Sequence, residues 1–231
     1  MADKPRVKAP KQRTGSTSDT GGRRRALVIG AALTGVALGF VAVAALLSFM
    51  GGGGSGSSDV ETVRTKLEAA GCTFQSAPGV EGQHSLAADD TSDKWNTDPP
   101  TTGPHFGFNP DGSLGTVIWG IYEEPIQLAR LVHNTEHGGI YILYGDKVAD
   151  ESIEQIRGFY ERRQNGTVVA PLPSLGDKIV FGVWVAEPEK ETGYLAKCTT
   201  FDEDAAAAFF NAFQFKGPER IPGSSLLPGG T

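Results

Sequence analysis

Methionine is almost absent from this chain, and basic residues are scarce beyond its first 25 positions. The 231 residues include two methionines, the first residue and Met50, so thioether sites for Cu(I) are excluded. Of 21 basic and 27 acidic residues, eight basic and two acidic ones lie in residues 1–25, which leaves 13 basic and 25 acidic residues, a net charge of −12, in residues 59–231. This excess of acid argues against nucleic acid or anionic lipid as a partner of residues 59–231, and it is compatible with cations.

Apolar residues are nearly missing from residues 1–25, where basic residues alternate with Pro, Ser, Thr and Gly. Such a segment cannot bury enough surface to offset its ordering entropy, so we predict that it is disordered. Its arginine cluster directly precedes an apolar run, and the positive-inside bias therefore places this tail in the cytoplasm, next to inner-leaflet lipid.

Charged residues are missing altogether from residues 26–50. A helix of this length, at about 1.5 Å per residue, exceeds the roughly 30 Å of a bilayer's hydrocarbon core. We therefore predict a single-pass transmembrane helix, with all later residues extracytoplasmic. The alternative is a cleaved signal peptide, but its apolar region is usually only about 7–15 residues long. The one small-x-small cleavage candidate, residues 42–44, lies inside the run.

Residues 51–58 contain only glycine and serine, which is the composition of a flexible linker. Residues 59–231 follow as one globular domain, long enough for a single core. The two cysteines of the chain, Cys72 and Cys198, both lie in this domain. In an oxidising compartment an even count favours a disulfide, and the alternative is that their thiolates bind a metal.

Apolar periodicity in residues 59–231 predicts an α+β domain with one small mixed sheet and about four helices. The helices are expected at residues 59–70, 123–137, 150–166 and 202–217. Asp59 and either Asp202 or Asp204 are candidate N-caps, and Pro125 suits the first turn of the second helix. Strands are expected at residues 72–74, 84–87, 116–122, 140–145, 167–171 and 178–186. Residues 91–115 lack periodicity, and long loops of this kind are usually functional.

Histidine is rare, and its four copies are clustered in residues 84–137: His84, His105, His133 and His137. On the second predicted helix, His133 and His137 are one turn apart and point away from the apolar face. Two imidazoles at i and i+4 can converge on one metal ion. We therefore predict a Zn(II) or Cu(II) site formed by His105, His133 and His137, with His84 or Glu136 as a further ligand and without an organic cofactor.

Other interpretations of the stretch LVHNTEHGG, residues 131–139, stay open. The two histidines can cap a helix C-terminus, where the dipole favours cationic side chains, or form a metal-free acid/base site. H-x-x-E-H is also the inverted zincin pattern, in which Glu136 would be the general base of a metal-dependent hydrolase. A further alternative is a metal-free module of the cell envelope, whose loop and helix end bind a peptide or the cell wall.

Several motifs occur together in one order: WNTDPPTTGPHFG, GIYEEPI, LVHNTEHGG, PLPSL, GVW and GPER. In this arrangement the chain resembles the bacterial domain-of-unknown-function 3105 family over about residues 71–220. The resemblance implies a typically membrane-anchored protein and gives weight to these motifs. Because the family has no established activity, the resemblance implies no reaction.

Overall fold

The computed structural model describes residues 55–85, 94–109 and 112–226, which belong to one compact unit, Gly53–Thr231. The predictions of a disordered tail in residues 1–25 and a transmembrane helix in residues 26–50 lie outside the described residues. Among the helices that are described, none is long and apolar enough to cross a membrane. Helix α2 begins at Ser55, so the second half of the segment predicted as a linker, residues 51–58, is helical.

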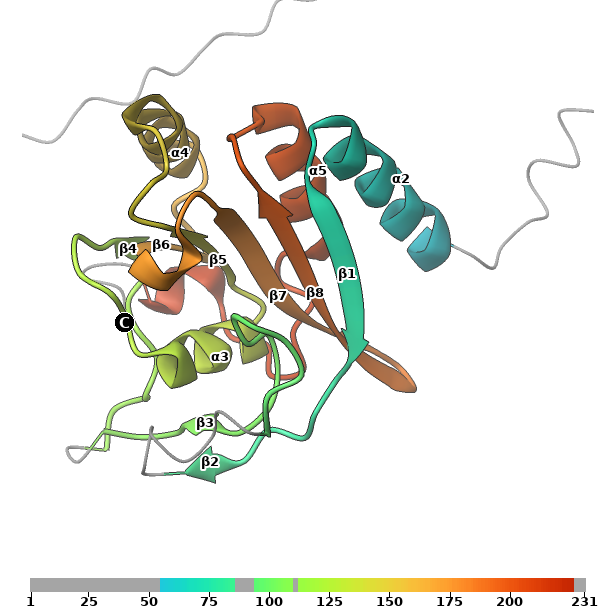
Figure 1. The fold of residues 1–231 in the computed structure, drawn as a ribbon. Helices are drawn as coiled ribbons and strands as arrows, with labels where there is room; N and C mark the ends of the chain where they lie inside the picture. Colours follow the sequence, from blue (N-terminus) through green and yellow to red (C-terminus); the bar gives the residue numbers. More distant parts are fainter. Residues whose placement is uncertain (1–54, 86–93, 110–111, 227–231) are drawn as a thin grey trace, which may run out of the picture. The chain divides into compact units, whose positions relative to one another are not determined.

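The unit is an α+β domain built on a mixed six-stranded sheet, as predicted (Figure 1). The strand order is β1-β8-β7-β5-β6-β4, in which β5, β6 and β4 run parallel and the other neighbours antiparallel. The strands are β1 (Thr73–Pro78), β4 (Gly120–Ile121), β5 (Ile140–Tyr144), β6 (Thr167–Pro171), β7 (Ile179–Glu187) and β8 (Lys190–Cys198). A separate parallel pair is formed by β2 (His84–Ser85) and β3 (His105–Phe106).

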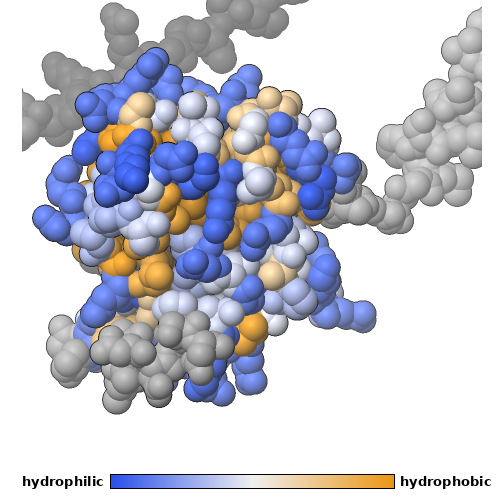
Figure 2. All heavy atoms as spheres, viewed as in Figure 1, coloured by the Kyte–Doolittle hydropathy of each residue, from blue (hydrophilic) through white to orange (hydrophobic). Residues whose placement is uncertain are grey.

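Four α-helices are described: α2 (Ser55–Ala69), α3 (Leu128–Glu136), α4 (Asp150–Glu161) and α5 (Glu203–Phe213). Alternation of side chains along the strands divides the core into two clusters. Ile142 and Phe181 pack with residues of α2, α4 and α5, whereas their neighbours Leu143 and Val180 pack with Leu131 of α3. Helix α3 therefore covers one face of the sheet, and the other three helices cover the opposite face. Figure 2 shows hydrophilic residues over most of the surface in view, with smaller apolar patches between them.

Several predicted boundaries need correction. Asp59 lies inside α2, so it is not an N-cap, whereas Asp202 does cap α5 by accepting a hydrogen bond from the Ala205 backbone at 2.8 Å. Helix α3 begins after Gln127, and Pro125 therefore precedes it. Strand β8 was not predicted, because its first half is polar, but it pairs with β7 along nine residues.

The strand predicted at residues 116–122 is shortened to Gly120–Ile121 because a side chain takes over its hydrogen bonds. The amide of Asn134 accepts from the backbone N–H of Val117 at 2.9 Å and donates to its carbonyl at 2.8 Å. This residue of α3 thus satisfies the polar groups that a neighbouring strand would otherwise pair.

The structure joins Cys72 to Cys198, which confirms the predicted disulfide. The two cysteines flank the paired residues Thr73 and Lys197, at adjacent ends of β1 and β8. Because no free cysteine is left, the alternative of thiolate metal ligands is wrong.

Candidate metal centre

Helix α3 ends where the two glycines of LVHNTEHGG begin. His137 is the C-cap residue, and Gly138 has a φ of +80°, a conformation that L side chains rarely adopt. A Cβ at Gly138 would also lie 2.6 Å from the Cα of Phe215. The chain therefore turns sharply at this point and leaves His133, Glu136 and His137 on the last turn of the helix.

The Pro-rich loop before β3 lies on the same face of the sheet as α3. The hydroxyl of Tyr141 donates to the carbonyl of Pro100 at 2.9 Å, and the hydroxyl of Thr135 donates to the carbonyl of Thr101 at 2.9 Å. Gly193 of β8 makes room for this loop, since a Cβ there would lie 2.0 Å from Oγ1 of Thr101. These contacts hold the loop against both the sheet and α3, and they bring His105 to the helix end.

The pairing of β2 with β3 adds the fourth histidine side by side with His105. His84 and His105 are register partners in this parallel pair, and the backbone N–H of His105 donates to the carbonyl of Gln83 at 3.0 Å. Their rings meet edge to face with centroids 4.8 Å apart. His84 is therefore positioned by strand pairing, whereas His133 and Glu136 are positioned by the helix.

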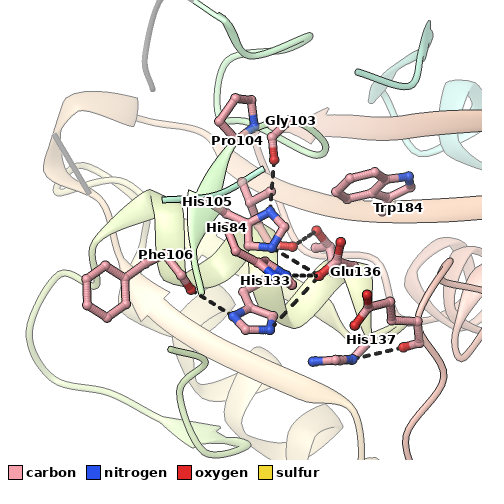
Figure 3. A network of polar contacts seen from close by, with 12 residues as sticks. His84, Gly103, Pro104, His105, Phe106, His133, Glu136, His137 and Trp184 are labelled. Carbon is pink, nitrogen blue, oxygen red and sulfur yellow. Dashed lines mark hydrogen bonds and ion pairs between the residues drawn. The ribbon is translucent and has the colours of Figure 1, made fainter. Parts of the chain in front are cut away.

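Three histidines and one carboxylate converge on a single point (Figure 3). One ligand atom from each of His84, His105, His133 and Glu136 lies within 4.8 Å of all the others. Oε2 of Glu136 is 3.0 Å from Nε2 of His105, 3.3 Å from Nε2 of His84 and 4.0 Å from Nε2 of His133. Four ligands about 2.0–2.2 Å from a tetrahedral ion are separated by distances of this order.

The sequence of this chain matches the family described as "Protein of unknown function (DUF3105)" over residues 84–224. The chain belongs to this family. The match begins at His84 and includes all four converging residues of the DUF3105 domain, whereas Cys72 lies before it. No curated protein and no solved structure matches the chain.

Backbone carbonyls fix the protonation of three rings in the DUF3105 domain. Nδ1 of His105 lies 2.9 Å from the carbonyl of Gly103, Nδ1 of His133 lies 2.8 Å from that of Phe106, and Nδ1 of His137 lies 2.9 Å from that of Glu219. A carbonyl only accepts hydrogen bonds, so each Nδ1 must carry the proton. In a neutral ring this leaves the lone pair on Nε2, which is the state that a metal ion requires.

Two of these Nε2 atoms, those of His105 and His137, are buried and have no hydrogen-bond partner among the residues that the structure describes. The approach of Glu136 to His105, 3.0 Å between Oε2 and Nε2, does not have the geometry of a hydrogen bond. A neutral His105 with its proton on Nδ1 would instead direct a lone pair towards an ionised carboxylate. Such an arrangement is costly when buried, and a cation between the two atoms relieves it. The residues present therefore fit a metal ion.

The structure places His105 beside one of the two predicted helical histidines, His133, and it adds both His84 and Glu136 to the group. His137 is adjacent to it: its ring centroid is 4.8 Å from that of His133, but it is not one of the four converging residues. Its role as a ligand stays a prediction. The sequence could not show that the carbonyls of Gly103 and Phe106 anchor these rings, because every residue has a backbone carbonyl.

Burial and neighbouring charges set the ionisation of the centre. Burial lowers the pKa of His133 to about 4, against the smaller opposing effect of its bond to Phe106. Burial would raise the pKa of Glu136, but interactions with Nε2 of His105 and Nε2 of His84, in the state in which these atoms carry protons, outweigh burial and hold this pKa below its ordinary value. At neutral pH the centre thus combines a neutral imidazole at His133 with an anionic carboxylate, both of which are competent ligands.

Acid should destabilise the metal-free domain between pH 6.5 and 4. The pKa of His133 is about 4 in the folded state against 6.5 for an ordinary histidine, so the unfolded chain binds the extra proton first as the pH falls. The contribution of neutral, buried His133 to the free energy of unfolding is fully present above pH 6.5. It is lost progressively towards pH 4, and for this shift it amounts to about 3 kcal/mol. Urea unfolding across this range, with chelator present, measures the effect. A free energy of unfolding that does not change between pH 7 and pH 4 would contradict it.

Proposed function

We propose that this DUF3105 domain binds one divalent transition metal ion, Zn(II) or Cu(II). The ligands are Nε2 of His84, His105 and His133 and a carboxylate oxygen of Glu136. One observation chiefly supports this site. Nδ1 of His105 and Nδ1 of His133 both donate hydrogen bonds to backbone carbonyls, so the Nε2 lone pairs of both rings are directed at the same carboxylate.

The donor set favours these two metals over others. Three imidazoles and one carboxylate suit Zn(II) and Cu(II), whereas Ca(II) and Mg(II) prefer oxygen ligands. Sulfur takes no part, because both cysteines are joined in the disulfide and the only methionine besides the first residue is Met50. A Cu(I) site of the thiolate or thioether kind is therefore not part of the proposal.

The proposed role is to sense, store or hand on the metal at the outer face of a membrane. Residues 26–50 would anchor the chain, with residues 1–25 in the cytoplasm. The disulfide supports an extracytoplasmic position for the domain, because disulfides persist in oxidising compartments. A protein or cell-envelope partner would receive or deliver the metal.

Hydrolysis is less well supported than binding. A general base must face an open position beside the metal, where water or substrate can enter. Oε2 of Glu136 instead lies among the imidazole nitrogens of His84, His105 and His133, and its side chain is buried. The metal-free alternatives leave the buried Nε2 of His105 without a partner in the described part of the chain, which also counts against them.

Purified residues 53–231, which contain both core clusters and the disulfide, should bind about one equivalent of Zn(II) or Cu(II) at neutral pH. Equilibrium dialysis with metal analysis measures this. Glu136→Gln should weaken binding by at least about tenfold, because it removes the negative ligand. Glu191→Gln is the matched control, since Glu191 bonds to Nε1 of Trp184 and is not in the centre. No tight binding by the unmutated domain would overturn the proposal.

A further inference from the structure

We infer that His84 is the exchangeable ligand of the centre, through which a metal enters and leaves, while His105, His133 and Glu136 form a fixed base of three ligands. The inference rests on the proposed function and assigns to it a mode of metal transfer. The four ligands would then have unequal roles.

The four side chains differ sharply in exposure. The side chain of His84 is 36% exposed, whereas those of His105, His133 and Glu136 are 0%, 1% and 7% exposed. Solvent and an incoming molecule therefore reach the centre at His84. The ring of His105 instead packs edge to face against the buried Trp184, with centroids 6.3 Å apart.

The four side chains also differ in how they are held. Nδ1 of His105 and Nδ1 of His133 each bond to a backbone carbonyl, which fixes the direction of both rings. The ring of His84 has no such anchor among the described residues, and its one hydrogen bond there is from Nε2 to Oε2 of Glu136 at 3.3 Å. His84 is thus the ligand that can rotate away at the lowest cost, and its Nε2–H can donate a hydrogen bond to Glu136 when no metal is bound.

Transfer would then proceed by ligand exchange at the metal. A lone pair of the recipient, from an imidazole or a carboxylate, forms a bond to the ion while the bond from the ion to Nε2 of His84 breaks. The oxidation state of the metal does not change, and the freed imidazole keeps its lone pair or takes a proton from water. Three protein ligands suffice to hold zinc during the exchange, as they do where the fourth position holds water.

The test compares His84→Ala with His105→Ala in residues 53–231 loaded with Cu(II). His84→Ala should still bind about one ion, release it to excess chelator at least about tenfold faster than the unmutated domain, and bind free imidazole at the vacated position. Added imidazole should alter its electron paramagnetic resonance spectrum and slow the release. His105→Ala should lose tight binding, and free imidazole should not restore it. Glu191→Gln should behave as the unmutated domain.

Two results would overturn the inference alone: equal loss of binding in His84→Ala and His105→Ala, or release from His84→Ala at the unmutated rate. Failure of the unmutated domain to bind Cu(II) or Zn(II) would overturn the proposed function as well. Circular dichroism of each variant separates loss of a ligand from loss of the fold. His105→Gln offers a polar replacement if alanine at this buried position prevents folding.

Discussion

Replacement of His133 by alanine should abolish tight metal binding in this DUF3105 domain. The ring of His133 is central in the cluster, with its centroid 5.3 Å from that of His84, 4.9 Å from that of His105 and 4.8 Å from that of His137. Its direction is fixed by the carbonyl of Phe106. Loss of a residue that only orients a metal ligand typically costs about 10–100-fold in metal affinity, and loss of this ligand itself should cost more than that.

The measurement is competition for Zn(II) between the domain and a chromophoric chelator of known affinity. His133 is buried, so alanine leaves a cavity and an unpaired carbonyl, and the fold of the variant must be confirmed by its circular dichroism and melting curve. His133→Asn, which retains a side-chain donor, provides a second variant. A folded His133→Ala domain with the affinity of the unmutated one would show that the centre does not bind the metal.

Loss of the disulfide should have the largest effect on stability. It closes a sequence separation of 126 residues, for which the chain-entropy model gives about 5 kcal/mol of stabilisation. For a domain of this size that corresponds to a fall in Tm of about 10–20 °C. The double variant Cys72→Ala, Cys198→Ala, melted beside the oxidised and the reduced unmutated domain, measures the effect.

The disulfide lies in the core cluster on the face of the sheet opposite α3 and Leu131. Metal stoichiometry should therefore be the same before and after reduction at temperatures where the domain stays folded. Mass spectrometry of the oxidised domain should show a deficit of about two daltons for the lost thiol hydrogens. Two free thiols in material exported to an oxidising compartment, or a reduced domain as stable as the oxidised one, would refute this prediction.

The sequence allowed the helices and the central strands to be predicted because each has its own apolar period. Strand β6 (Thr167–Pro171) was predicted to the residue, and the cap of α5 at Asp202 was among the candidates. Strand β8 was not predicted because its sequence, KETGYLAKC, begins with polar residues, which form a hairpin with β7. The shortening of β4 depends on the amide of Asn134, which is a tertiary contact that local pattern does not encode.

The candidate ligands were predictable because histidine is rare and its four copies are close in sequence. Their unequal roles were not predictable. The pairing of His84 with His105 depends on the register of two strands of only two residues each. The anchoring of the rings depends on carbonyls contributed by the loop and by Glu219. The helical spacing of His133 and His137 indicated one shared metal, yet the structure brings Glu136 rather than His137 into the group of four.

X-ray absorption at the zinc edge, on residues 53–231 loaded with one equivalent of Zn(II), reports directly whether His84, His105, His133 and Glu136 bind the ion. We expect a four-coordinate ion with nitrogen and oxygen donors at about 2.0–2.2 Å, and outer-shell scattering from three imidazole rings. The outer-shell signal should fall to two rings in His84→Ala. An ion surrounded mainly by water oxygens, without imidazole scattering, would show that these residues do not form the metal site.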